Sequence, residues 1–381
     1  MARRNVSIEP GQWYPVRLEV SGNNFVFYVD DNPVAENQFP KYDAVDPSYT
    51  AGQLALRVTA GQAEFRNVSV ELYQGELPEI TYQNPVQAGC ADPEVLKYQN
   101  LYYAYCTYTP DFPQMVNGIR LYTSTDLVNW EDQGYVLNNE DSWGVSRFWA
   151  PDIVERDGTF YFYYAVDERI AVAQADSPMG PFKQQEQKPM EPDSIKIDAY
   201  VFEDDDGKRY FYYVGFNNGN HIWGAELSDD MMSIKAGTAK KMISPEEPWE
   251  THMANVAEGA VILKHNGTYY LTYSGSHFES PHYSVGYATA SHPLGPWTKY
   301  ENNPIMKSTS YAHGTAHHSI VASPDGSELF IVYHQHNDLA TTEPRQMAID
   351  RLQFIPQENG PDILEAWGPT MSPQPMPKMI F

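Results

Sequence analysis

The stretch "VAEGAVILKHNGTYYLTY" (residues 256–273) indicates the fold, because its order of residue types recurs along the chain. It places a carboxylate, Glu258, ahead of an apolar run, an Asn-Gly turn and a second run rich in aromatic residues. An Asn-Gly pair between two apolar runs is a strong hairpin signal, because both residues tolerate the positive φ of a tight turn. The stretch therefore predicts a β-hairpin whose first strand begins with an acid.

Four other stretches share this shape. They are "GCADPEVLKYQNLYYAY" (89–105), "FWAPDIVERDGTFYFYY" (148–164), "KIDAYVFEDDDGKRYFYY" (196–213) and "TAHHSIVASPDGSELFIVY" (315–333). In four of the five copies a glycine follows an anchor by nine residues, and the first copy is one residue shorter with Asn100 at that place. The anchors are Asp92, Trp149, Asp198, Glu258 and His317. Repeats of a three- or four-stranded unit indicate blades, so the chain is predicted to be all-β, with a five-bladed β-propeller.

The five anchors are predicted to meet at one mouth of the propeller. The innermost strand of each blade lines the central channel, so one repeated position places five side chains around one axis. A channel kept polar only by water would favour Ser, Thr and Asn, whereas three of these anchors are acids in mutual repulsion. The anchors therefore favour a functional site over a solvated channel.

Three acids around one cavity suit the hydrolysis of glycosidic bonds. One carboxyl protonates the leaving oxygen, a second activates water, and a third acid nearby raises the pKa of the proton donor. Acids from different blades face each other across a channel, which favours the separation of roughly 6.5–9.5 Å that an inverting enzyme needs. The repeat thus predicts an inverting hydrolase.

Composition narrows the partners. The 381 residues include 50 Asp and Glu against 25 Lys and Arg, a net charge of −25. Such a surface repels phosphate, which argues against nucleic acid and against an anionic membrane. No apolar run approaches the roughly 20 residues needed to span a bilayer. Aromatic residues make up 14% of the chain and suit stacking on sugar rings, so a neutral saccharide remains the favoured partner.

Residues 1–78 have a different pattern from residues 79–381, which we assign to the propeller domain. Alternating strands with Gly and Asn-Asn turns fill "PGQWYPVRLEVSGNNFVFYVDDNPV" and "AGQLALRVTAGQAEFRNVSVELYQ". The segment resembles part of a concanavalin-like, jelly-roll β-sandwich. It is too short for a whole sandwich, so we expect the chain to begin inside a longer gene product. The start of this chain has no signal peptide; a signal upstream would make the full-length protein secreted or periplasmic.

The order of the motifs resembles glycoside hydrolase family 43 from about Thr81 to about Pro373. The motifs are "ADPEV", "FWAPDIVE", "IDAYVFEDDDG", "VAEGAVILKHNGTYYLTYSG", the "GPF" and "GPW" turns and "GTAHHSIV". The resemblance implies that Asp92 is the general base, Asp198 the residue that adjusts the pKa of the acid, and Glu258 the general acid. It further implies that His317 lies over a channel ion, usually Ca²⁺, although the family motif more often has Pro-Gly where this chain has Thr-Ala before the histidine.

Four residues are expected to bind substrate. The resemblance assigns Arg345 to a sugar hydroxyl, Phe112 to a cap over the pocket and His317 to the site, while Trp149 is expected to form a wall of the sugar pocket. The alternatives are a core indole for Trp149 and a surface ion pair for Arg345. Asp152 is expected to be a structural turn residue. Cys90 and Cys106 flank the first hairpin, either as a disulfide or as two buried thiols.

The resemblance implies an enzyme that removes terminal pentoses from plant cell-wall polymers. An exo-acting α-L-arabinofuranosidase is favoured, followed by a β-xylosidase or an enzyme with both activities, then an endo-arabinanase or a galactofuranosidase. The partner is an oligosaccharide or polysaccharide that contains arabinose or xylose, and no organic cofactor is expected. A sugar-binding propeller without turnover is the rival, but it would have no need for a proton donor such as Glu258. The sequence leaves the oligomeric state open.

Overall fold

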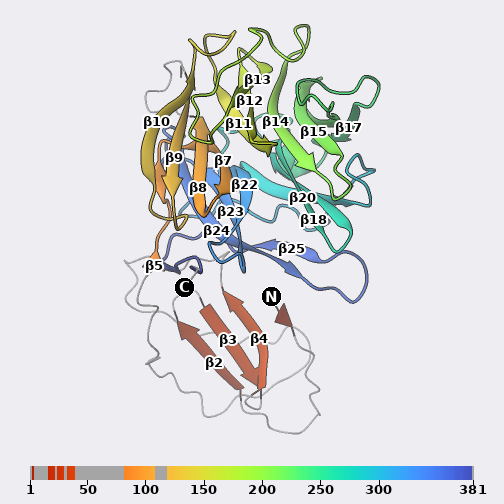
Figure 1. Cartoon of the computed structure of the whole chain (residues 1–381). Coiled ribbons are helices and arrows are strands. Elements are labelled where there is room, and N and C mark those ends of the chain that lie inside the picture. Colours follow the sequence, from red (N-terminus) through yellow and green to blue (C-terminus); the bar gives the residue numbers. More distant parts are fainter. Residues whose placement is uncertain are drawn as a thin grey trace.

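The computed structural model consists of β-sheets (Figure 1). It describes the backbone of residues 2–3, 16–21, 24–29 and 32–38, and residues 81–107 and 118–379 in full. In this part of the chain the only helix is the three-residue 3₁₀ helix η1 (Pro248–Glu250). No helix of the described residues is long and apolar enough to cross a membrane.

The N-terminal strands form an antiparallel sheet in the order β1-β4-β3-β2. Their bounds are β1 (Ala2–Arg3), β2 (Val16–Ser21), β3 (Asn24–Val29) and β4 (Asn32–Gln38). β2 and β3 pair in antiparallel register, with Ser21 opposite Asn24. This sheet agrees with a β-sandwich segment, and the boundary between residues 78 and 79 stays a prediction.

Five further sheets confirm the predicted propeller. Blade 1 contains β7 (Ala91–Tyr98), β8 (Leu101–Thr107), β9 (Gly118–Ser124) and β10 (Glu131–Asn138), and blade 2 contains β11 (Trp149–Arg156), β12 (Thr159–Val166) and β13 (Arg169–Ala175). Blade 3 contains β14 (Lys196–Glu203), β15 (Arg209–Phe216), β16 (Asn220–Glu226) and β17 (Lys240–Ile243). Blade 4 contains β18 (Ala257–His265), β19 (Thr268–Gly275), β20 (Ser284–Ala290) and β21 (Thr298–Lys299). Blade 5 contains β22 (Ala316–Ala322), β23 (Leu329–Gln335), β24 (Gln346–Ile355) and β25 (Ile363–Ala366).

The inner strands form a closed ring. β7, β11, β14, β18 and β22 each contact the next, and β22 contacts β7 again. Segments from the two ends of the propeller also pair with each other: β5 (Thr81–Tyr82) pairs with β26 (Gln374–Pro375), and β6 (Gln87–Ala88) adds to β24 of blade 5. Closure leaves no inner edge exposed, which is the advantage of this architecture.

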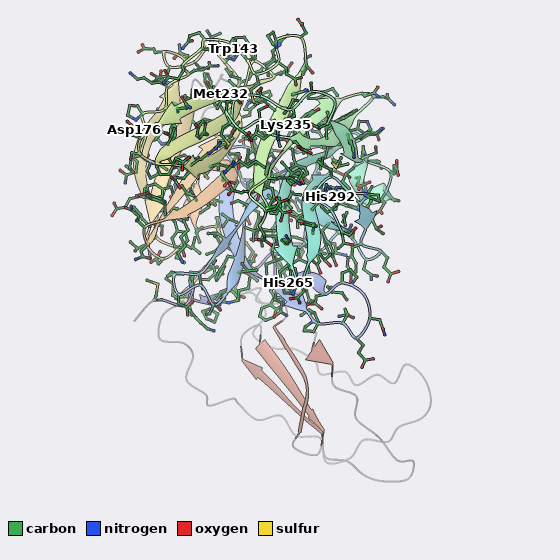
Figure 2. The ribbon with its side chains drawn as sticks, turned by 45° about the vertical axis from the view of Figure 1, so that its right-hand side comes forward. Trp143, Asp176, Met232, Lys235, His265 and His292 are labelled. Carbon is green, nitrogen blue, oxygen red and sulfur yellow. A yellow bond between two sulfur atoms is a disulfide. The ribbon has the colours of Figure 1, made fainter. Side chains whose placement is uncertain are left out.

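The apolar core lies between the blades. Five clusters of buried residues each combine side chains of two neighbouring blades. One residue from each blade of the five pairs is Phe162 with Leu121, Phe211 with Tyr163, Tyr212 with Leu271, Tyr333 with Tyr287, and Phe330 with Tyr102. Polar side chains also make contacts where blade 4 meets blade 5. There His265, labelled in Figure 2, stacks on Phe354 with ring centroids 3.8 Å apart and pairs with Asp362 at 2.8 Å.

Each inner strand carries a β-bulge near its start, and this bulge positions the channel residues. The pairing register shifts in every inner hairpin at a residue with positive φ. These residues are Asp92 (47°), Ala150 (41°), Asp198 (55°), Gly259 (57°) and His317 (47°). The equivalent positions in blades 2 and 4 are thus Ala150 and Gly259, one residue after the predicted anchors Trp149 and Glu258. The count of nine residues to the glycine was misleading, because the glycine follows the bulge residue by nine positions in blades 3 and 5 but by eight in blades 2 and 4.

A disulfide and a buried acid have structural roles in blades 1 and 2. Cys90 and Cys106 form a disulfide, with Cα atoms 5.0 Å apart, that ties the start of the first hairpin. Asp152 is not a turn residue: it lies in β11, is buried, and accepts the Val201 N–H from blade 3 at 3.0 Å. Burial raises the pKa of Asp152 to about 8 despite this hydrogen bond.

Candidate active site

A cavity of about 730 Å³ opens where the bulges of the inner strands meet. Asp92, Asp198, Glu258, His317 and Trp149 all line it, so the structure brings the five predicted anchors together. Asp92, Asp198 and His317 also line a second cavity of about 20 Å³. Its other walls come from residues farther along the inner strands, such as Glu94 and Tyr200, so it continues along the channel and has room for about one water molecule.

Asp92 is held ionised by its neighbours. Arg345 Nη1 donates to Asp92 Oδ1 at 2.8 Å, and His317 Nδ1 lies 3.5 Å from the same oxygen. The Asp92 N–H donates to His334 Nδ1 at 3.1 Å. Burial alone would raise the pKa of Asp92, but Arg345, His317 and His334 together lower it well below its usual value. A carboxylate that stays ionised at neutral pH is suited to accept a proton from water.

Glu258 is positioned by one hydrogen bond to each oxygen. Tyr283 donates its hydroxyl to Oε1 at 2.8 Å, and Asn220 donates Nδ2–H to Oε2 at 2.8 Å. Tyr283 is fully buried and Asn220 is half-buried, and both residues line the cavity. Asn220 is therefore the more exposed of the two partners of Glu258.

Asp198 is the acid whose protonation changes near neutral pH. Burial is the main cause; His317 opposes it, and the negative charges of Glu258 and Asp92 add to it, which raises the pKa of Asp198 to about 7. Its Oδ2 is buried and has no hydrogen-bond partner in the described part of the chain. The N–H of Gly259, at the neighbouring bulge, contributes a hydrogen bond to the carboxylate. A carboxylate oxygen of Asp198 and one of Glu258 lie within 4.8 Å of each other, so the charge of Glu258 acts directly on Asp198.

Asp198, Glu258 and His317 also form a group that could hold a cation. One ligand atom from each lies within 4.8 Å of the others, and Asp198 Oδ2 is without a partner among the described residues. Two carboxylates and an imidazole fit a divalent cation in charge. Calcium prefers six to eight oxygen ligands, so these three side chains alone would not complete its coordination.

The remaining predicted residues have different positions. Arg345 is buried rather than on the surface and joins Asp92 to Glu343, whose Oε1 accepts Arg345 Nε–H at 3.0 Å. Trp149 is a half-buried wall of the cavity, and the guanidinium of Arg147 lies 6.0 Å from its ring. Phe112 lies outside the described residues.

The sequence assigned no role to four residues of the site. Tyr283 and Asn220 hold Glu258, Glu343 holds Arg345, and His334 contacts Asp92. These four residues lie outside the repeated anchor position, so the repeat does not indicate them. His334 lies in β23, the second strand of the fifth hairpin, opposite Ala316 and next to the anchor His317, and that position was the available signal.

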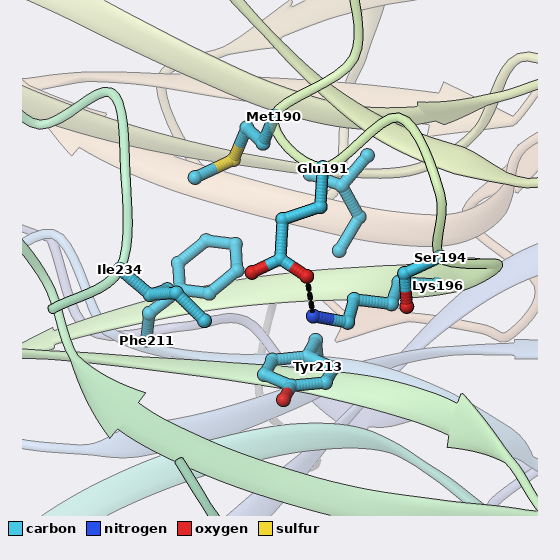
Figure 3. Close-up of a pocket in the computed structure, with 8 residues that line it drawn as sticks. Met190, Glu191, Ser194, Lys196, Phe211, Tyr213 and Ile234 are labelled. Carbon is cyan, nitrogen blue, oxygen red and sulfur yellow. Dashed lines mark hydrogen bonds and ion pairs between the residues drawn. The ribbon is translucent and has the colours of Figure 1, made fainter. Parts of the chain in front are cut away.

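The charge of the cavity limits its ligands. Five acids line it against two arginines: Asp92, Glu168, Asp198, Glu258 and Glu343 against Arg147 and Arg345. An anionic ligand would be repelled, while a neutral, hydroxyl-rich ligand could bind to both kinds of group. A second pocket, lined by residues such as Ile170 of blade 2 and Phe211 of blade 3, has a volume of only about 10 Å³ and is too small for a sugar ring (Figure 3). There Lys196 pairs with Glu191 and lies 4.2 Å from the ring of Tyr213, which fixes the segment before β14.

The comparison with protein families gives two matches. Residues 82–358 match the family glycosyl hydrolases family 43. Residues 1–71 match the 3-keto-alpha-glucoside-1,2-lyase-like domain family. The first match covers the five blades and the cavity, and the second covers the N-terminal sheet.

Individual relatives agree with the first match. The chain is 30% identical over 293 residues to the beta-D-galactofuranosidase xynD of Aspergillus niger, a match that covers 71% of this chain and 82% of the relative. It is 27% identical to an extracellular exo-alpha-(1->5)-L-arabinofuranosidase of Streptomyces avermitilis, over 68% of this chain and 57% of that protein. The crystal structure of a thermostable family-43 glycoside hydrolase superposes with a TM-score of 0.71 at 38% identity, and the match covers 79% of this chain and 100% of that one. The chain belongs to glycosyl hydrolases family 43 and is a glycoside hydrolase.

Proposed function

We propose that the protein is an inverting, exo-acting α-L-arabinofuranosidase. The observation that carries this proposal is the meeting of Asp92, Asp198 and Glu258 at one cavity, with Asp92 ionised beside Arg345. The similarity to an enzyme named exo-alpha-(1->5)-L-arabinofuranosidase supports the choice of sugar. The acidic lining of the cavity supports a neutral substrate over one that carries uronic acids.

In the proposed mechanism Asp92 and Glu258 act on opposite sides of the scissile bond. Asp92 accepts a proton from the water that attacks the anomeric carbon, and protonated Glu258 gives its proton to the leaving oxygen. Asp198 and Glu258 would repel each other if both were ionised, so one proton stays on these two acids. Arg345 holds Asp92 in place and presents its remaining N–H groups to a sugar hydroxyl.

A second candidate is a β-D-galactofuranosidase, because the Aspergillus niger relative carries that name. Both sugars are furanoses, and the acids of the site would act on either in the same way. A β-xylosidase remains the third assignment.

The test is hydrolysis of three 4-nitrophenyl glycosides side by side: α-L-arabinofuranoside, β-D-galactofuranoside and β-D-xylopyranoside. The proposal predicts the highest kcat/KM with the arabinofuranoside. A higher kcat/KM with the galactofuranoside or the xylopyranoside would make that sugar, and not arabinofuranose, the preferred substrate. No hydrolysis of any of them by the folded protein rejects exo action.

We further propose that a divalent cation, expected to be Ca²⁺, binds at His317 in the channel. Asp198 and Glu258 lie within reach, and the bound ion would supply positive charge against the repulsion of the acids. Prolonged chelation should lower Tm, and Ca²⁺ added back should restore it. An unchanged Tm after chelation would contradict the proposed ion.

The full-length protein is proposed to act outside the cytoplasm. The support is the word extracellular in the name of the Streptomyces relative. Fractionation of the native source, with the activity assayed in each fraction, tests this proposal.

A further inference from the structure

The hairpin that joins β15 to β16 carries two side chains next to Glu258. Phe216, the last residue of β15, pairs in register with Asn220, the first residue of β16. Residues directly opposite each other in an antiparallel pair point to the same face, with Cβ atoms about 4.5–5.5 Å apart. The ring of Phe216 therefore lies beside the amide of Asn220.

Asn220 places this hairpin on the leaving-group side of the reaction. Its amide donates to Glu258 Oε2 at 2.8 Å, whereas the fully buried Tyr283 donates to Oε1. The leaving oxygen must approach Glu258 from the cavity, where Asn220 is the more exposed of these two partners and Phe216 lines the wall beside it. The group attached to that oxygen consequently meets the hairpin first.

The hairpin is rigid enough to act as a platform. Asn217 N–H donates to Gly219 O at 3.0 Å, and Asn220 N–H donates to Asn255 O at 3.0 Å in the loop before β18. Gly219 has a φ of 130°, and a Cβ there would lie 2.7 Å from Asn255 O, so only glycine allows this close packing. The Asn217 carbonyl also lies 2.8 Å from Nε2 of the His221 ring.

Phe216 is an aromatic side chain with no structural reason to be exposed. It is 48% exposed, lines the large cavity, and belongs to none of the buried clusters between the blades. Met253, in the loop to which the hairpin is bonded, is 68% exposed. Exposed apolar side chains at the rim of a polar cavity mark a binding surface.

We propose that Phe216 forms a leaving-group subsite, on which the sugar residue released by the enzyme stacks with its C–H face. The proposal rests on the proposed function, since it needs Glu258 to be the proton donor. It assigns the natural leaving group to a neutral sugar ring, because Phe216 offers an apolar face and the cavity around it is acidic. Asn220 holds Glu258 toward the oxygen that joins the two sugars.

The test compares two substrates that share the cleaved sugar. One is a disaccharide, α-1,5-L-arabinobiose or β-1,4-xylobiose, and the other is the glycosyl fluoride of the same sugar, whose leaving group has no ring. Wild type, Phe216→Ala and Phe216→Tyr are compared, with Tyr135→Ala as the control. Tyr135 is 50% exposed on β10 and does not line the cavity.

The proposal predicts a loss of about tenfold in kcat/KM with the disaccharide for Phe216→Ala, mainly through KM, which is the scale of one aromatic contact. The glycosyl fluoride should change by less than about twofold, and Phe216→Tyr should restore the disaccharide value. Equal losses with both substrates, or no loss with the disaccharide, would overturn the subsite. If wild type cleaves the fluoride alone, the hydrolase stands and the subsite fails; if it cleaves neither, the proposed function and the subsite fail together.

Discussion

Single residues of the site differ in charge state because their surroundings differ. Asp92 and Asp198 start equivalent bulges, but only Asp92 has a guanidinium 2.8 Å away. The pKa of Asp92 is therefore lowered, and that of Asp198 is raised to about 7 by burial. Asp92 is therefore suited to accept a proton from water, whereas Asp198 is suited to support a proton donor beside it.

The roles of Asp92 and Glu258 can be separated by the leaving group. Glu258→Gln should lower kcat by about 10³-fold with a disaccharide, because the leaving oxygen then receives no proton. The same variant should keep most of its activity with a glycosyl fluoride, which needs little acid assistance. Asp92→Asn should lose about 10³-fold with both substrates, because water activation is needed in each case.

Steady-state kinetics of the two variants on the two substrates make this measurement. Asp205→Asn serves as control, since Asp205 is an exposed acid on the blade 3 hairpin. Equal losses of both variants on both substrates would contradict the division into acid and base.

Elements position the site through short contacts between blades and loops. The loop before β18 contributes Asn255 and Val256 to the cavity, and it is anchored by Glu250 of η1. Glu250 is fully buried, accepts the Tyr273 hydroxyl at 2.6 Å and pairs with Lys299 at 2.7 Å. The backbone N–H groups of Glu246 and Glu247 donate to its other oxygen.

Glu250→Gln should destabilise this loop. Loss of the charge leaves Lys299 partly buried without its partner, which costs about 3 kcal/mol. We expect Tm to fall by several degrees and KM to rise, because the loop lines the cavity. Thermal unfolding and kinetics should be compared with Glu301→Gln, an exposed acid in the same blade. A Tm equal to that of the control would show that Glu250 does not anchor the loop.

At the scale of elements, repetition decided what the sequence could predict. The five hairpins share a turn and an anchor, so the propeller and the meeting of Asp92, Asp198, Glu258 and His317 followed from counting residues. The displacement of Trp149 and Glu258 from the bulge was missed, because turn lengths differ between blades. Tyr283 and Asn220 were missed because they come from connections with no repeat, whose positions depend on packing.

The whole molecule is stabilised by buried acids, one between two blades and one within blade 5. Asp152 accepts a backbone N–H of blade 3, and Asp350 accepts the hydroxyls of Tyr333 and Thr370. Burial raises the pKa of Asp152 to about 8 and that of Asp350 to about 7. Both acids therefore hold protons in the folded chain at pH values where the unfolded chain has lost them.

Stability should consequently fall as pH rises from about 5 to about 8. The folded state binds more protons than the unfolded state in this window, so raising the pH favours unfolding. Below about pH 4 the trend reverses, because Asp92 has a lowered pKa and its protonation breaks the pair with Arg345. Tm measured across pH 3 to 9 should therefore pass through a maximum near pH 5 and decline by several degrees toward pH 8.

Asp350→Asn is the matched comparison for this pH dependence. The variant has no proton to lose at residue 350, so its Tm should decline less steeply between pH 6 and pH 8. A wild-type Tm that rises from pH 5 to pH 8 would contradict the assignment of protons to these buried acids.

Asp92 is proposed to activate water while Glu258 protonates the leaving group. The stereochemistry of hydrolysis is the most direct test of these two roles. Proton NMR of a glycoside during the first minutes of hydrolysis distinguishes the two anomers of the released sugar before they interconvert. The anomer formed first should have the configuration opposite to that of the substrate, because water displaces the leaving group in one step. A product with the configuration of the substrate would contradict these roles, since retention requires a covalent intermediate on one of the carboxylates.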